Sequence, residues 1–233
     1  MKHWILTGAL LLTTALFAET PAPADPALLC EINDNFEIAL PKARLLSFEN
    51  IGFERSVGYR FNGRNSYIML EEKGPKKTLT TKLSIACTAA VSELPPKGQE
   101  PSPIFFRPGY HNYLGVDYRG LVAFNIWTKT PDGKNISNHL YSKRTVRVGE
   151  GRFFRAAVTL EPVGENSYKV KLYMDGALEN EKVITGKIFD HNNTFYLGGA
   201  RPSIQNVPPL NGVIRACRVY SRVLSDEEIL SLL

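Results

Sequence analysis

The chain has 233 residues and a formal net charge of +5, with 28 basic and 23 acidic side chains. Charges of both signs are interspersed without a cluster of Lys or Arg, so the small positive excess does not favour nucleic acid as a partner. Beyond the N-terminal stretch, no segment approaches the roughly 18 apolar residues of a membrane-spanning helix, and we expect no membrane insertion.

The first 18 residues have the pattern of a secretory signal peptide. A basic residue, Lys2, precedes an apolar stretch too short to cross a bilayer, and the small residue Ala18 ends it. We expect cleavage after Ala18, with Ala24 as the second choice; a buried N-terminal helix is the alternative. A lipid anchor on Cys30 is not expected, because the bulky Leu29 stands where a lipobox needs a small residue. The protein is therefore expected to be secreted, either periplasmic or extracellular.

Residues 19–27 form a short Pro/Ala linker, and residues 28–233 are long enough for one β-domain. Asp132-Gly133 and Asp175-Gly176 are strong signals for hairpin turns, and proline-rich loops at 94–103 and 201–209 interrupt the strands. Many short strands with turns between them predict a two-sheet antiparallel sandwich. The clearest strands are expected at residues 66–70, 78–91, 113–118, 121–128, 152–161, 167–175 and 193–199.

The C-terminal segment predicts one more strand and a short helix. Polar and apolar residues alternate over 218–224, which is typical of a half-buried strand. Ser225 and Glu228 have the spacing of a capping box, and Leu224 and Ile229 that of a hydrophobic staple. A helix of one or two turns is not stable alone, so we expect it to cover the β-structure.

Several short motifs follow one another along the chain in an order with a known counterpart. An aromatic-x-Gly element at Phe61 and Gly63 precedes the strand of Tyr67; a hairpin at 172–176, a strand at 195–199 and the ending 210–229 follow. In this order they resemble the laminin-G-like domain of the concanavalin A-like lectin/glucanase superfamily. The resemblance covers almost all of residues 28–233. It implies an all-β, two-sheet antiparallel jelly-roll sandwich with a short C-terminal helix.

Three cysteines allow one disulfide and leave one thiol over. The resemblance implies that the strands around Cys87 and Cys217 are neighbours, which favours a Cys87–Cys217 disulfide. Two alternatives stay open: three separate buried thiols, and a pairing that involves Cys30.

The resemblance also raises the question of a calcium ion, which laminin-G-like domains often hold and which needs hard oxygen ligands. At the position where the family often has two acids, this chain has Asn62 and Ser66, with Arg64 between them. The last strand has Ile214-Arg215-Ala216 where acids are frequent. A neutral-to-basic site would bind calcium weakly. We therefore expect no metal and no other cofactor.

Catalytic carboxylates of the glucanase type are not found. Retaining glucanases of this fold need two carboxylates close together on one strand face. Glu31 and Asp34 lack the third acid of the motif, and the acids at 226–228 belong to the helix cap. We therefore expect no glucanase activity.

The segment 105–120 has the densest group of aromatic, basic and amide side chains. It can be read as surface packing, as a carbohydrate contact through aromatic faces beside hydrogen-bonding groups, or as a catalytic cluster. The candidate ligand-binding residues are Arg107, Tyr110, His111, Asn112, Tyr113, Tyr118 and Arg119.

These features predict a secreted, non-catalytic binding module that recognises extracellular carbohydrate or a protein partner through loops at one rim. One alternative is an adhesion module that binds proteins through a sheet face, which an exposed aromatic patch would favour. The other is a polysaccharide-active enzyme that uses Tyr110, His111 and Tyr118. That enzyme requires these side chains to converge with Arg107 or Arg119 in one cleft.

Overall fold

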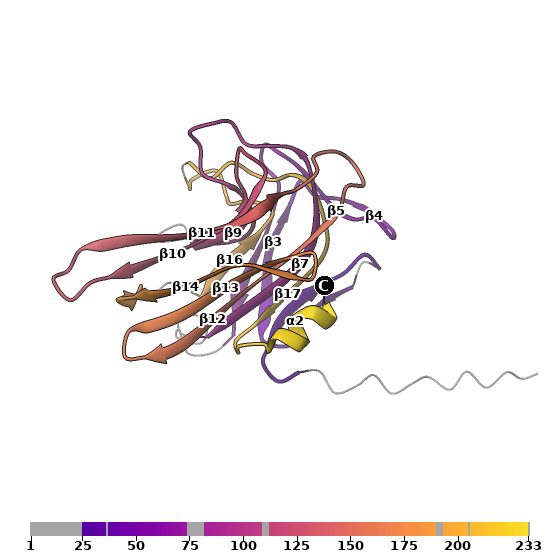
Figure 1. Ribbon diagram of the computed structural model, residues 1–233. Coiled ribbons are helices and arrows are strands. Elements are labelled where there is room, and N and C mark those ends of the chain that lie inside the picture. The colour runs from indigo at the N-terminus through magenta and orange to yellow at the C-terminus, as the bar shows by residue number, and fades with distance from the viewer. Residues whose placement is uncertain are drawn as a thin grey trace, which may run out of the picture.

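The computed structural model describes residues 25–35, 37–73, 82–108, 112–189, 193–204 and 206–232. The expected signal peptide, most of the linker, and the candidates Tyr110 and His111 lie outside the described residues. Two antiparallel sheets pack face to face, and one short helix lies against them (Figure 1). The predicted all-β sandwich is confirmed. In the described part of the chain, no helix combines the length and apolar character that a membrane span requires.

The first sheet, sheet A, has the strand order β14-β13-β12-β7-β17-β1-β2, and β5 also pairs with β17 and with β4. Its strands are β1 (Leu28–Ile32), β2 (Ile38–Ala39), β4 (Gly52–Glu54), β5 (Gly58–Asn62), β7 (Leu83–Glu93), β12 (Phe154–Gly164), β13 (Ser167–Met174), β14 (Ala177–Thr185) and β17 (Asn211–Tyr220).

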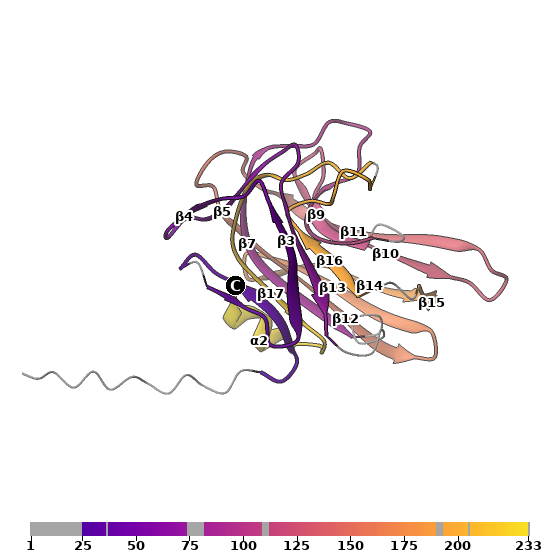
Figure 2. The same cartoon turned by 180° about the vertical axis from the view of Figure 1, so that it is seen from behind.

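The second sheet, sheet B, has the order β11-β10-β9-β8-β16-β6-β3, and β15 pairs with β10. The hairpin of β10 and β11 extends beyond the neighbouring strands in both views (Figures 1 and 2). The strands of sheet B are β3 (Ala43–Glu49), β6 (Tyr67–Glu72), β8 (Ser102–Arg107), β9 (Asn112–Val116), β10 (Leu121–Lys129), β11 (Asn135–Thr145), β15 (Lys187–Ile188) and β16 (Thr194–Leu197).

The main core lies between the two sheets and takes every second residue of the central strands, as the two-residue period of a strand requires. Two of the sequence motifs meet in it. Gly198 has a φ of +72°, and a Cβ atom at that position would lie 2.0 Å from the ring of Phe61. A side chain at residue 198 would therefore displace the buried Phe61, which explains why glycine follows the last residue of β16, Leu197.

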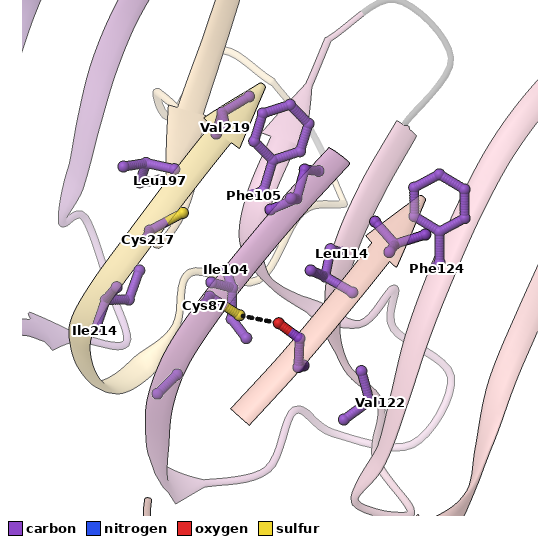
Figure 3. Close-up of a cluster of buried hydrophobic side chains, with 14 of the residues drawn as sticks. Cys87, Ile104, Phe105, Leu114, Val122, Phe124, Leu197, Ile214, Cys217 and Val219 are labelled. Carbon is purple, nitrogen blue, oxygen red and sulfur yellow. Dashed lines mark hydrogen bonds between the residues drawn. The ribbon is translucent and has the colours of Figure 1, made fainter. Parts of the chain in front are cut away.

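The cysteines lie in this core, and the expected disulfide is absent. Cys87 and Cys217 are direct partners across β7 and β17, so the predicted neighbourhood is correct. All three cysteines are nevertheless free thiols. The Cys87 sulfur donates a hydrogen bond to the carbonyl oxygen of Ala156, 3.4 Å away on β12, as the dashed line in Figure 3 shows. Burial raises the pKa of Cys87 and Cys30 to about 12, so both are buried neutral thiols.

The helix α2 (Asp226–Leu232) lies against the outer face of sheet A (Figure 1). The predicted capping box is present: the Ser225 amide donates to the Glu228 carboxylate at 2.8 Å, and the Glu228 amide donates to the Ser225 hydroxyl at 3.2 Å. Leu224 and Ile229 pack in one apolar cluster with Ala86 and Ala157 of the sheet. The helix therefore covers the sheet, as predicted.

The strand before this helix is shorter than its alternation predicted. β17 ends at Tyr220, whereas the pattern runs to Leu224. The Ser221 amide bonds to the carbonyl of Ala27, and the Arg222 guanidinium binds the carboxylate of Asp25. These contacts join the segment after β17 to the N-terminal segment.

Candidate functional site

A cleft of about 860 Å³ lies on the outer face of sheet B. Its floor comes from β9 and β11, and its walls come from three loops that lie far apart in the sequence. The lining residues are Gly98, Gln99, Glu100, Pro101, Tyr113, Asp117, Tyr118, Arg119, His139, Tyr141, Asn206, Val207 and Pro208.

One wall of the cleft is a tight turn built around a buried carboxylate. Asp117 accepts hydrogen bonds from the backbone amides of Arg119 and Leu121, at 2.8 and 3.0 Å. Its second oxygen, Oδ2, accepts from two nitrogens of the Arg119 guanidinium, Nε at 2.8 Å and Nη2 at 2.7 Å. These bonds raise the pKa of Arg119, which stays charged. The turn therefore holds the guanidinium in one direction while 46 % of the Arg119 side chain remains exposed.

Aromatic rings surround that guanidinium. The Arg119 carbon Cζ lies 4.8 Å from the ring centre of Tyr141 and 5.7 Å from that of Tyr118. His139 stacks on Tyr141 with ring centres 5.9 Å apart and planes 5° from parallel. Because side chains alternate along a strand, residues 137, 139 and 141 of β11 point to the same face. The Arg119 guanidinium and the rings of Tyr118, His139 and Tyr141 therefore lie against one another on this face.

A chain of hydrogen bonds crosses the floor of the cleft. Tyr113, Asn125 and His139 stand opposite one another on β9, β10 and β11. The Ser137 hydroxyl donates to the Asn125 oxygen at 2.8 Å, so the His139 Nε2–H donates to Ser137, also at 2.8 Å. Nδ1 of His139 then carries no proton, and the Tyr113 hydroxyl lies 3.4 Å from it. The network thereby selects one histidine tautomer.

Burial sets the charge of these groups. It lowers the pKa of His139 and raises that of Tyr113, and the nearby Glu100 carboxylate raises the pKa of Tyr113 further. Both rings are therefore neutral near pH 7. The cleft presents one fixed cation, neutral hydrogen-bonding rings and the Glu100 carboxylate.

The family model described as the concanavalin A-like lectin/glucanases superfamily, Laminin_G_3, matches residues 62–230. The chain belongs to this superfamily. The match includes every strand that forms the floor of the cleft, and it confirms the resemblance derived from the motifs.

Solved structures with the same fold include binding domains and domains of glycosidases. Domain 4 of AbnA, a GH43 extracellular arabinanase from Geobacillus stearothermophilus, in complex with arabinotriose, is 17 % identical with a TM-score of 0.60; the match covers 88 % of this chain and 97 % of that one. The botulinum neurotoxin serotype D binding domain is 14 % identical with a TM-score of 0.60, over 88 % of this chain and 51 % of that one.

A sialidase from Trypanosoma rangeli is 17 % identical with a TM-score of 0.62, over 91 % of this chain and 35 % of that one. This chain spans about half the length of the neurotoxin binding domain. No curated protein matches the sequence. At these identities the likeness shows the fold alone.

The structure brings together only some of the predicted binding residues. Tyr113, Tyr118 and Arg119 line the cleft. Arg107 and Asn112 are buried at the facing ends of β8 and β9, and the Asn112 side chain accepts the amide of Trp127 at 3.0 Å. Neither of these two lines the cleft. The described residues do not include Tyr110 and His111, so their convergence with Arg119 remains a prediction.

Sequence reasoning missed His139, Tyr141 and Glu100. A signal for the first two was present, because Ser137, His139 and Tyr141 recur at every second position after the Asp132-Gly133 turn. Pairing that strand with residues 121–128 would have placed them beside Ala123 and Asn125. Glu100 could not be found in this way, since it lies in a proline-rich loop without periodicity.

The position at which laminin-G-like domains often hold calcium is an ordinary turn in this chain. The Asn62 side-chain oxygen accepts from the Arg64 amide, the Asn65 amide and the Ser66 hydroxyl, at 2.9 to 3.1 Å. These donors occupy the oxygen that a calcium ion would need. Among the described residues, no three His, Cys, Asp or Glu side chains come together as a metal site.

Proposed function

We propose that this domain is a secreted, non-catalytic module that binds carbohydrate in the cleft on the outer face of sheet B. The observation that carries the proposal is the Arg119 guanidinium, which Asp117 fixes beside the faces of Tyr118 and Tyr141. Sugar rings present apolar C–H faces and hydroxyl edges, so they suit aromatic planes beside fixed donors. A volume of about 860 Å³ accommodates a short oligosaccharide.

Two structural neighbours support this ligand class. Domain 4 of the arabinanase is in complex with arabinotriose, and a botulinum neurotoxin DC binding domain is in complex with SialylT. Both share the fold over 88 % or more of this chain. Fold likeness alone does not carry a ligand from one protein to another, so the cleft chemistry remains the main argument.

Binding is favoured over catalysis because the buried carboxylate of the cleft already has partners. Asp117 accepts hydrogen bonds from two backbone amides and from Arg119, so its oxygens hold the turn in place instead of facing a glycosidic bond. Binding of sugar is also favoured over adhesion through a sheet face. Tyr118 is the single aromatic among the exposed large hydrophobic side chains of the described residues, and it lies at the cleft.

A polysaccharide-active enzyme is the second candidate, because one contact supports it. The Tyr113 hydroxyl lies 3.4 Å from the His139 ring nitrogen and close to Glu100, so a proton could move between these groups. This candidate predicts that a glycan that binds is also cleaved. Release of new reducing ends during incubation would support it, and unchanged glycan would support the binding module.

A glycan-binding screen of the purified protein, with and without calcium, tests the proposal. Arg119→Ala and Tyr141→Ala should each weaken binding about tenfold or more, since the first removes a charged donor and the second removes the ring against which that donor lies. Arg55→Ala is the matched control, because Arg55 is exposed on the turn between β4 and β5, away from the cleft. Binding to no glycan, or equal binding by all three variants, would contradict the proposal.

A further inference from the structure

A second cleft, of about 680 Å³, lies over β7, β12 and β17 of sheet A and the end of β11 of sheet B, and it gathers arginines from separate parts of the chain. Its lining contains one acidic residue, Asp175. We call it the arginine cleft after its five basic side chains, which are Arg144, Arg147, Arg152, Arg155 and Arg215.

Strand pairing and one loop produce this convergence. Arg155 on β12 stands opposite Thr88 on β7, and Thr88 stands opposite Ala216 on β17. A register shift between Ile214 and Ala216 places Arg215 at this point of the face. The loop 147–153 then closes over the end of the strands, held by a bond from the Gly149 amide to the carbonyl of Val91.

Among the described residues, three of the five guanidinium groups have no carboxylate partner. Arg144 binds Glu179 at 2.6 Å, and Arg215 lies 3.9 Å from Asp34 at the limit of an ion pair. Asp175 accepts a hydrogen bond from the backbone amide of Arg155. Within the described part of the chain, the exposed side chains of Arg147, Arg152 and Arg155 form no ion pair.

Such an arrangement has an electrostatic consequence. Like charges held in one concave surface repel one another and raise the local potential, which concentrates anions there. Guanidinium groups bind sulfate and carboxylate oxygens through paired N–H donors. A cleft of this volume exceeds the size of one small anion, so several anionic groups can bind together.

We propose that the arginine cleft binds an acidic polysaccharide through its sulfate or carboxylate groups. Single-stranded nucleic acid fits less well, because bases need free aromatic faces. The one half-exposed ring of the cleft, Phe153, is covered by Arg215, with Cζ 3.7 Å from the ring centre. This site is separate from the proposed carbohydrate cleft, since the two share no lining residue, although β11 contributes side chains to both.

The test measures affinity for dextran sulfate, for polygalacturonate and for unsubstituted dextran across a series of salt concentrations. We compare the wild type with the double variant Arg152→Gln and Arg155→Gln. The control double variant is Arg55→Gln and Arg64→Gln, which removes two exposed arginines elsewhere on the surface that form no ion pair with any described residue. Both doubles change the net charge equally.

The wild type should bind at least one acidic polymer and not dextran. The cleft variant should lose about a hundredfold in affinity, about tenfold for each arginine, and its log affinity should depend less steeply on log salt. The control variant should stay within about threefold, because single exposed charges contribute little. Tyr141→Ala should bind the polymer like the wild type, which separates this site from the proposed function.

Three results would overturn the proposal. Equal losses in both double variants would show attraction by net charge alone. If the wild type binds neither acidic polymer, acidic polysaccharide is not the ligand of the arginine cleft. Tighter binding of oligothymidylate than of either polymer, with the same loss in the cleft variant, would assign the cleft to nucleic acid. Thermal unfolding of each variant confirms that any loss comes from a folded protein.

Discussion

The two outer faces of the sandwich are covered in different ways. On sheet A, α2 places Leu224 and Ile229 over the small side chains Ala86 and Ala157, and the covered area is apolar. On sheet B, loops rather than a helix cover the aromatic cluster of Phe106, Tyr113 and Tyr196, and Ile204 and Val207 supply their apolar contacts. The loops leave a polar cleft beside that cluster.

Ionic contacts serve different ends on these faces. Around α2, Arg222 binds both Asp25 and Glu228, and Lys171 binds Asp226, so these five side chains all form ion pairs within the network. In the sheet B cleft, the carboxylate of Asp117 is buried while its partner Arg119 is half-exposed. On one face, charges therefore attach a helix, and on the other a buried carboxylate fixes the direction of an exposed guanidinium.

The largest effect on stability is expected at the covered face. Ile229→Ala removes a fully buried side chain, and we expect it to lower the free energy of unfolding by about 2 to 5 kcal/mol. Leu230→Ala, one residue further and 48 % exposed, should change it by less than about 0.5 kcal/mol. Chemical denaturation measures both. Similar values for the two variants would show that α2 does not seal the sheet.

A smaller loss is expected at the open face. Asp117→Ala removes the acceptor of two backbone amides and the partner of Arg119, so we expect about 1 to 3 kcal/mol less stability, together with loss of carbohydrate binding. Asp132→Ala removes an exposed ion pair with Lys134 and should leave both properties near wild type. Full binding by Asp117→Ala would mean that Arg119 needs no positioning.

The capping box should contribute less again. Ser225→Ala removes the side-chain acceptor of the Glu228 amide, and we expect a loss of about 1 kcal/mol in unfolding experiments. Ser231→Ala is the matched control at the other end of α2, where the hydroxyl only donates to a carbonyl of the same helix. If the two serine variants are equally stable, the cap contributes nothing measurable.

The smallest effect is an acid dependence carried by Glu228. Its bond to Arg222, and the Ser225 amide, lower its pKa from 4.5 to about 2. Because the folded-state value is the lower one, the stabilisation is present above about pH 4.5 and disappears as the pH falls toward 2. Between pH 4.5 and 2, the melting temperature should therefore fall less steeply with decreasing pH for Glu228→Gln than for the wild type. Identical pH profiles would contradict the assignment.

Local patterns predicted the turns and the cap because their contacts span few residues. Asp175 and Gly176 have positive φ angles of 47° and 75°, as the hairpin signal requires. The Ser225–Glu228 box forms with both hydrogen bonds. By contrast, the strand ending at Tyr220 depends on Asp25 and Ala27, nearly 200 residues away, and no local pattern contains that contact.

It was also easier to predict which strands are neighbours than to predict which bonds their side chains form. Cys87 and Cys217 do face each other, as the order of strands implied, but the Cys87 thiol donates to Ala156 on the opposite neighbour. Tyr113, Tyr118 and Arg119, which the sequence analysis grouped by their closeness in the chain, line one cleft, and their role in binding stays a prediction. Arg107 lies outside this cleft, and its side chain is buried.

The sequence by itself determined the all-β class, the family, the hairpin turns and the capped helix, since these depend on period, spacing and local hydrogen bonds. Only the tertiary structure decided which face stays open, and that Glu100, Arg119, His139 and Val207 line one cleft. It also gathered five arginines, from residues 144 to 215, in a chain whose charges are interspersed. Both clefts depend on the register between distant strands, which packing of the whole core sets.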